Sequence, residues 1–185
     1  AGVQDRKVWL FDSFEGLPPP QEIDGAVAMT YAQRPEDPWY HDNCSASLED
    51  VQHSAAALGL TAYTHFVKGW FDQTLPVHRQ RLGPIALLRV DGDWYASVRC
   101  CLEQLYDQVV DGGLVVLDDY YAWDGCAIAA HEFLGSRRLA HRIEGVLGQA
   151  AGEEGYQTAV FRKGAGKVTW QWIYQMSLVT QDLAG

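Results

Sequence analysis

Two pairs of aspartates are the residues of this chain whose type and spacing could do chemistry. Asp91 and Asp93 follow an apolar run at residues 85–90, and Asp118 and Asp119 follow another at residues 114–117. Both runs have the composition of buried strands, and the segment between the two pairs has a helical pattern. A strand, a crossover helix and a second parallel strand bring both C-terminal strand ends to one edge of a sheet, where open α/β sheets bind ligands. We therefore expect the four carboxylates to converge on one crevice.

Carboxylates that lie so close together cannot all be ionised unless a positive charge offsets them. Their oxygen atoms are hard ligands of the kind that Mg²⁺, Mn²⁺ and Ca²⁺ prefer. The pattern therefore predicts a divalent metal site at this edge of the sheet. The alternative interpretation is that the aspartates only cap helices and form turns, which are common positions for this residue type.

The composition is that of a globular protein and argues against several classes of function. The chain has 185 residues, of which 48% are hydrophobic and 21% charged, so we expect one domain over residues 1–185 with a sizeable core. The net charge of −10 argues against nucleic acid as a partner. No apolar run is long enough to span a membrane, and no signal-peptide pattern is visible. The four cysteines form no CxxC pair, which favours reduced thiols and a cytoplasmic protein.

Strands and helices are predicted to alternate along the chain, which indicates an α/β fold with a mostly parallel sheet. Patterning predicts strands at residues 7–11, 61–67, 85–90, 114–117 and 155–161, and helices at residues 47–58, 77–83, 95–107 and 125–138. Residues 21–45 have the composition of a loop, and a loop of that length is often a lid or a binding loop. Residues 168–174 alternate in hydrophobicity and are a candidate for a further strand.

Five motifs follow one another along the chain: FDSFEGLP (11–18), SLEDV (47–51), KGWFDQTLP (68–76), LRVDGDWYAS (88–97) and GGLVVLDDY (112–120). Taken together in this order, they resemble the TylF/MycF family of macrocin-type O-methyltransferases. The resemblance covers about residues 8–163 and implies a Rossmann-like class I methyltransferase sheet. It also implies an enzyme that uses S-adenosylmethionine and a divalent metal, Mg²⁺ or Mn²⁺, to methylate a sugar hydroxyl of an antibiotic or related glycoside. The expected partner is thus a small-molecule glycoside, and the chain is a candidate homo-oligomer.

The resemblance implies a role for each aspartate of the two pairs. It makes Asp91, Asp118 and Asp119 the metal ligands and Asp93 the general base. Local chemistry agrees with this division of roles. Coordination to Mg²⁺ lowers the pKa of a bound hydroxyl as it does that of bound water, and a carboxylate two residues from a ligand lies close enough to receive the proton.

The same resemblance implies a cofactor site. It places Asp12 against the ribose of the cofactor, where an acid accepts hydrogen bonds from the diol, with Ser13 beside it in the same site. Trp70 and Phe71 follow the strand whose end holds the adenine in this fold. Stacking on the cofactor and packing in the core are both open for these two rings.

One feature of the family is missing from the sequence. These methyltransferases have a first strand and a glycine-rich turn that lies against the cofactor, and no such segment precedes Val8. That strand would lie at the centre of the sheet, between the strands at residues 7–11 and 85–90, where its absence leaves buried backbone groups without partners. We expect that the chain is a fragment of a longer protein. The alternatives are an omitted N-terminal portion, or the Trp-rich tail at residues 168–174 replacing the strand or serving another chain.

Two other functions remain open at this point. Asp91 and Asp93 also fit the Asp-x-Asp pattern that holds the metal of a nucleotide sugar in glycosyltransferases, although the second acid pair argues against it. The chain could also be a non-catalytic binding module that keeps the metal pocket and cannot hold cofactor. The missing glycine-rich turn favours that alternative.

Overall fold

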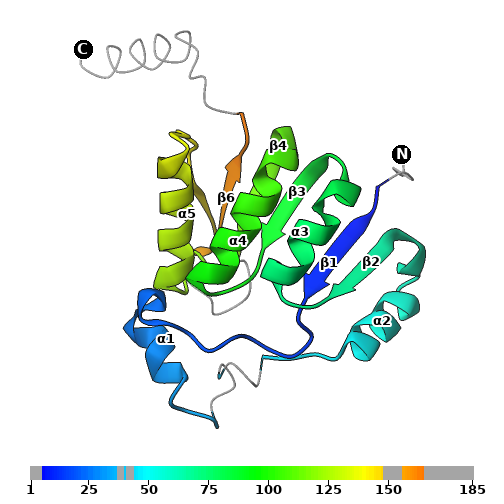
Figure 1. Ribbon diagram of the computed structural model, residues 1–185, viewed down its shortest axis with the longest axis horizontal. Coiled ribbons are helices and arrows are strands. Elements are labelled where there is room, and N and C mark those ends of the chain that lie inside the picture. The colour runs from blue at the N-terminus through cyan, green and yellow to red at the C-terminus, as the bar shows by residue number, and fades with distance from the viewer. Residues whose placement is uncertain (1–5, 37–39, 41–43, 148–155, 165–185) are drawn as a thin grey trace, which may run out of the picture.

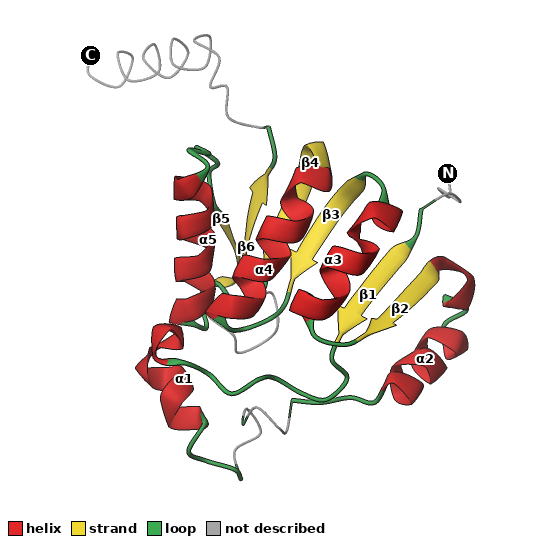
Figure 2. Ribbon diagram, in the orientation of Figure 1, coloured by secondary structure: helices red, strands yellow, loops and turns green. Residues whose placement is uncertain are grey.

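The chain alternates strands and helices as expected for an α/β protein (Figure 1; Figure 2). The computed structural model describes residues 6–36, 40, 44–147 and 156–164, so the candidate strand at residues 168–174 lies outside the described residues. The strands are β1 (Val8–Asp12), β2 (Thr64–Lys68), β3 (Ile85–Val90), β4 (Val109–Leu117), β5 (Glu144–Leu147) and β6 (Tyr156–Arg162). The α-helices are α1 (Gly25–Tyr31), α2 (Leu48–Ala57), α3 (Phe71–Leu82), α4 (Tyr95–Leu105) and α5 (Asp124–Ser136). Short 3-10 turns are η1 (Glu22–Asp24), η2 (Thr61–Tyr63) and η3 (Tyr106–Gln108).

The strands form two hydrogen-bonded sheets. In one, β1 and β2 run parallel; the other has the order β3-β4-β6-β5, with β3 parallel to β4 and β6 antiparallel to both its neighbours. β1 lies next to β3 and runs in the same direction (Figure 1). Among the described residues, however, no strand pairing joins these two strands. Within the described residues the sheet is thus interrupted between β1 and β3, where the resemblance places a further strand.

The hydrophobic core lies between the four-stranded sheet and the helices α4 and α5, which cover one face of it (Figure 2). The buried positions of α4 recur every three or four residues and so share one face of the helix. They are Val98, Cys101, Leu102 and Leu105. On β4 the alternate residues Val115 and Leu117 are fully buried. This packing holds the C-terminal ends of β3 and β4 in place.

The segment at residues 21–45 is not the continuous loop that its composition predicted, because it contains η1 and α1. Asp24 explains why the segment orders. Its carboxylate is almost fully buried and accepts a hydrogen bond from the backbone N–H of Gln21 at 2.7 Å and another from Tyr95, the first residue of α4, at 2.7 Å. A long-range contact of this kind leaves no mark in local composition.

The start of α3 also differs from the prediction, which had only a short helix at residues 77–83. The structure has one helix from Phe71 to Leu82 with Pro76 inside it. Proline lacks the N–H that would bond the carbonyl four residues earlier, which disfavours a helix interior. Leu75, only 1% exposed, anchors this helix in the core, and tertiary packing overrides the local preference. β5 was not predicted, because its Glu-Gly-Val-Leu sequence lacks a strand pattern.

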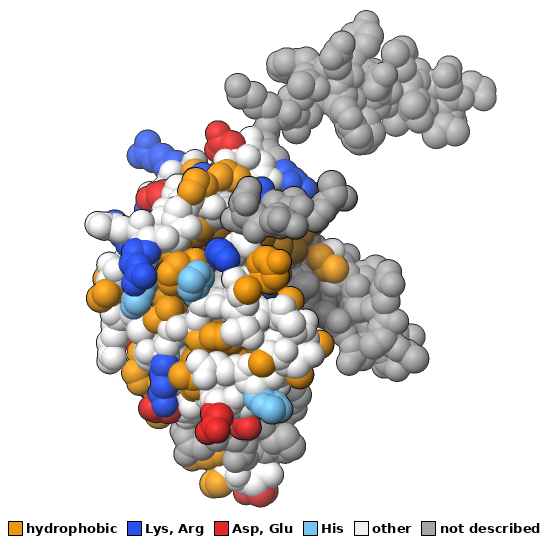
Figure 3. Space-filling view, turned by 90° about the vertical axis from the view of Figure 1, so that its right-hand side faces the viewer, with side chains coloured by type: hydrophobic (Ala, Val, Ile, Leu, Met, Phe, Trp, Pro, Cys, Tyr) orange, Lys and Arg blue, Asp and Glu red, His pale blue; other side chains and the backbone are white. Residues whose placement is uncertain are grey.

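The side of the molecule that carries α2 and β2 is only lightly packed. Hydrophobic side chains lie there among charged and histidine side chains on an open surface (Figure 3). Val8 on β1 is 55% exposed, and α2 has no buried residue. Within the described part of the chain, no helix is both long enough and apolar enough to cross a membrane.

Candidate metal and cofactor site

The parallel pairing of β3 and β4 aligns the two acid pairs. Val90 is in register with Leu117, and the backbone N–H of Asp118 donates to the carbonyl of Val90 at 3.0 Å. Asp91 and Asp118 therefore leave neighbouring strands at the same level. The expected convergence of the two acid pairs on one sheet edge is confirmed.

Three of the four carboxylates form a compact cluster. One carboxylate oxygen from each of Asp91, Asp93 and Asp119 lies within 4.8 Å of the other two. The backbone N–H of Asp93 also donates to Asp119 Oδ2 at 3.0 Å. Asp93 has a left-handed backbone with φ 54°, which aspartate tolerates better than most side chains do. This conformation places Asp93 in the turn between β3 and α4, beside the strand-end acids.

Asp118, the fourth acid, is turned to a different partner. The guanidinium of Arg89 bonds both of its oxygens, with Nη2 at 2.7 Å from Oδ2 and Nε at 3.3 Å from Oδ1. Nη1 of the same arginine lies 2.6 Å from Asp91 Oδ2. The family resemblance implied Asp118 as a metal ligand, and the compact cluster contains Asp93 instead. The role of Arg89 was not predicted, because the sequence shows it only as one position of a predicted strand.

Burial and mutual repulsion raise the pKa values of the clustered acids. Burial, with repulsion from Asp119 and Asp91, raises the pKa of Asp93 to about 7. Burial raises the pKa of Asp119 to about 6, although backbone N–H donors oppose the shift. The pKa of Asp91 is also raised by burial, and Arg89 opposes this effect. A site with so much unfavourable negative charge fits a hard divalent cation, for which carboxylate oxygens are suitable ligands.

Trp123 contacts the carboxylate of Asp93 through a hydrogen bond. Its indole Nε1 donates to Asp93 Oδ2 at 3.1 Å and so favours the ionised carboxylate. The Trp123 ring packs edge-on against Tyr31 of α1, with centroids 5.6 Å apart, and lies 5.1 Å from the Trp94 ring. Aromatic residues near the second acid pair were visible in the sequence, but the hydrogen bond to Asp93 was not.

A pocket of about 320 Å³ adjoins the acid cluster and shares Asp91 with it. Its wall includes all four residues assigned to the cofactor site from the sequence: Asp12, Ser13, Trp70 and Phe71. Other lining residues were not assigned a role from the sequence: Leu17, Pro18, Asp72, Gln73, Ser97 and Cys100. Most of these lie inside the five motifs, so their position in the motifs was the available signal.

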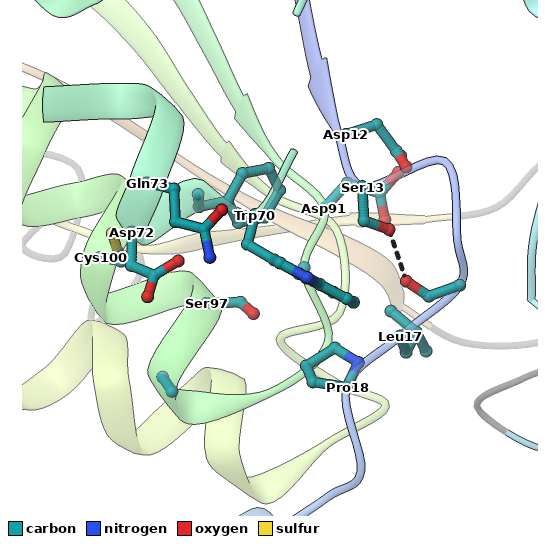
Figure 4. A pocket seen from close by; sticks show the side chains of 14 residues that line it. Asp12, Ser13, Leu17, Pro18, Trp70, Asp72, Gln73, Asp91, Ser97 and Cys100 are labelled. Atoms are coloured by element: carbon teal, nitrogen blue, oxygen red, sulfur yellow. Dashed lines mark hydrogen bonds between the residues drawn. The ribbon is translucent and has the colours of Figure 1, made fainter. Parts of the chain in front are cut away.

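The close-up view shows how the pocket is built (Figure 4). The Trp70 ring lies between the Asp12–Ser13 side and the side that carries Gln73 and Ser97. Asp12 Oδ1 accepts from the backbone N–H of Phe14 at 2.6 Å, and the Ser13 hydroxyl donates to the Gly16 carbonyl at 2.8 Å. These bonds fix the loop after β1. Ser13 is 7% exposed, so its main contribution is to the shape of the wall.

Comparison with known proteins gives the family and the fold of the chain. The chain matches the family described as Macrocin-O-methyltransferase (TylF) over residues 1–151. It is 34% identical over 148 residues to 8-demethyl-8-(2,3-dimethoxy-alpha-L-rhamnosyl)-tetracenomycin-C 4'-O-methyltransferase of Streptomyces olivaceus, covering 80% of this chain and 54% of the relative. It is 36% identical over 144 residues to demethyldecarbamoylnovobiocin O-methyltransferase of Streptomyces niveus, covering 76% of this chain and 52% of the relative.

A solved structure of the O-methyltransferase NovP is similar to this one, with a TM-score of 0.69 and 29% identity. The similarity covers 87% of this chain and 61% of that one. The chain spans about half the length of the curated relatives it matches. The predicted class I methyltransferase fold is confirmed, and the chain belongs to the macrocin O-methyltransferase (TylF) family.

Proposed function

We propose that this chain carries the catalytic edge of an S-adenosylmethionine- and divalent-metal-dependent O-methyltransferase that acts on a sugar hydroxyl of a glycosylated natural product. The observation that carries the proposal is the shared wall between the pocket and the acid cluster. Asp91 lines the pocket and also belongs to the carboxylate group, so a ligand in the pocket lies beside the acids. Such proximity is what a transfer between two bound molecules requires.

The pocket suits the adenosyl part of the cofactor. Asp12 at one side offers a carboxylate to a ribose diol, and the Trp70 and Phe71 rings offer apolar surface to a flat base. Asp72 and Gln73 follow directly on the same wall and provide polar groups for the edge of that base. When bound, S-adenosylmethionine would supply the methyl group, and Mg²⁺ or Mn²⁺ would lower the pKa of the acceptor hydroxyl.

The acids divide into ligands and a base in this proposal. Asp91, Asp118 and Asp119 would hold the metal, and Asp93 would accept the proton of the hydroxyl. Asp93 suits that role because it lies two residues from Asp91 and because Trp123 fixes one of its oxygens. The cluster that includes Asp93 leaves one alternative, in which Asp93 is itself a ligand.

A sugar acceptor is favoured by the aromatic residues beside Asp93 and by the relatives. Trp123, Trp94 and Tyr31 form a group of rings next to the base, and rings with polar edges suit ligands that have both apolar and polar faces. One relative is named for 4'-O-methylation of a rhamnosyl-bearing compound, and another for mycinamicin III 3''-O-methylation.

Calorimetric titration tests the cofactor and metal parts of the proposal. S-adenosylhomocysteine should bind the chain, and binding should be measured with Mg²⁺ and with EDTA. A non-catalytic module would bind Mg²⁺ without binding S-adenosylhomocysteine. Methyl transfer to a panel of deoxysugar glycosides should stop in EDTA, and undiminished turnover there would contradict the metal role.

The variant D93N tests the division of roles. It should lower the methylation rate by roughly 10²–10⁴-fold, the usual scale for removing a positioned base, while Mg²⁺ affinity changes little. D111N is the matched control, since Asp111 is exposed near the opposite end of β4. Loss of Mg²⁺ binding in D93N would instead make Asp93 a ligand.

A further inference from the structure

Arg89 is the one basic side chain that the described structure pairs with the strand-end acids. It lies on β3 between the buried residues Leu88 and Val90, and its own side chain is 52% exposed. The guanidinium bridges the ends of two strands, because it contacts Asp91 after β3 and Asp118 after β4. A single arginine therefore compensates part of the negative charge at the site.

The geometry of this bridge separates Asp118 from the other acids. Both oxygens of Asp118 face the guanidinium, at 2.7 and 3.3 Å, whereas only one oxygen of Asp91 does. Asp91 also contributes an oxygen to the cluster with Asp93 and Asp119. A carboxylate held by a planar two-pronged donor is well oriented, and it must leave that donor to give both oxygens to another cation.

We propose that Arg89 is the internal counter-ion of the carboxylate site, which holds Asp118 in the metal-free protein and releases it when a divalent cation binds. This inference rests on the metal role given under Proposed function. An arginine stays protonated at all accessible pH values, so it competes with the metal through charge and geometry alone. Arg89 is in this sense a positioning residue that sets how tightly the site takes up metal.

An ordinary surface ion pair is the competing explanation, and the chain offers one for comparison. Arg99 on α4 also contacts two acids, with Nε 2.5 Å from Glu103 and Nη1 3.4 Å from Glu132. Those glutamates lie on α4 and α5, apart from the carboxylate cluster. Removing Arg99 should therefore leave metal binding unchanged, which makes it a matched control.

The experiment is a Mg²⁺ titration, by calorimetry, of the whole chain and three variants. R89M removes the charge and keeps most of the side-chain volume, and it should bind Mg²⁺ about tenfold more tightly, as expected for the loss of one competing ion pair of modest strength. R89K keeps the charge and loses the two-pronged donor, and its gain should be smaller. R99M should bind with the affinity of the unmodified chain.

A double-mutant cycle assigns the effect to Asp118. In a D118N background, R89M should bring a much smaller gain in Mg²⁺ affinity than it does alone. Thermal melting checks folding. In EDTA, R89M should melt at a lower temperature than the unmodified chain, and adding Mg²⁺ should raise the melting temperature of R89M more than that of the unmodified chain.

The possible outcomes distinguish the counter-ion role of Arg89 from the metal site given under Proposed function. If the unmodified chain binds Mg²⁺ and R89M binds equally or more weakly, the counter-ion role is wrong and the metal site stands. If R89K, which folds with its charge intact, binds like the unmodified chain while R89M binds more tightly, charge alone acts and the clamp on Asp118 is wrong. If neither the chain nor any variant binds Mg²⁺, the metal part of the proposed function fails and this inference fails with it.

Discussion

The two sheets of the molecule differ in how well they are packed. The β3-β4-β6-β5 sheet, with α4 and α5, contains most of the continuous core, including Leu102 and Phe133, which are almost completely buried. In the β1-β2 sheet only Val67 is buried, and Leu10 of β1 is 36% exposed. Interior side chains in close-packed surroundings tolerate little displacement. The β3-β4-β6-β5 sheet is therefore the more rigid support of the two.

This difference matters because the two parts of the site depend on different sheets. The acid cluster stands entirely on the ends of β3 and β4 and the turn before α4. The pocket needs both sheets, since Asp12 comes from β1 whereas Asp91 comes from β3. Metal binding should therefore depend on the well-packed sheet alone, and cofactor binding on how the two sheets meet.

Truncating the core should give the largest effect. L102A should lower the free energy of unfolding by about 2–5 kcal/mol, the usual range for a fully buried leucine. L10A, the same change on the exposed β1, should lower it by less than about 1 kcal/mol. Chemical denaturation of both variants tests this, and equal losses would contradict the difference in packing.

Two aspartate variants should then separate the metal from the cofactor. D119N should weaken Mg²⁺ binding by roughly 100-fold because it removes a charged ligand, with a small effect on S-adenosylhomocysteine. D12N should weaken S-adenosylhomocysteine by roughly tenfold, because it loses a charge-assisted hydrogen bond, and leave Mg²⁺ affinity unchanged. Calorimetry measures both constants. If each variant lost both ligands, the two parts of the site would not be independent.

Stability should also respond to pH through the acid cluster. The pKa values of Asp93 and Asp119 are raised, to about 7 and about 6, so the folded state binds more protons than the unfolded chain between pH 4 and 7. Stability in EDTA should therefore fall as pH rises, by about 2 kcal/mol between pH 5.5 and 8. D93N should remove most of this slope, whereas D111N should retain it. A metal-free chain that becomes more stable over this range would contradict the raised pKa values.

The smallest effect concerns the hydrogen bond that orients the base. W123F keeps the aromatic packing and removes the donor to Asp93, so the methylation rate should fall roughly tenfold. Mg²⁺ affinity and the KM for cofactor should not change. The variant D111N, which changes an exposed side chain near the opposite end of β4, is the control. A fall in Mg²⁺ affinity in W123F would show that Trp123 supports the metal cluster itself.

The sequence was sufficient for the placement of the acids but not for their pairing. A strand, helix and parallel strand can bring Asp91 and Asp119 together in essentially one way, so periodicity and handedness predicted that much. The bridge from Arg89 to Asp118 depends on side-chain conformation, and the bond from Trp123 to Asp93 joins residues far apart in the chain. Neither leaves a periodic pattern, and α1 was missed for the same reason, since Asp24 orders it through a contact with α4.

Asp24 has a consequence for which positions of α1 are free to change. Its carboxylate ties η1 and the start of α4 together, and α4 begins two residues after Asp93. On α1 itself, Ala28 is fully buried while Val27 is 59% exposed. Substitutions at outward positions such as Val27 can therefore change the surface of α1, while the bond from Tyr95 to Asp24 still holds η1 against the start of α4. The helix thus has one position that packing fixes, Ala28, and an exposed face that packing leaves unconstrained.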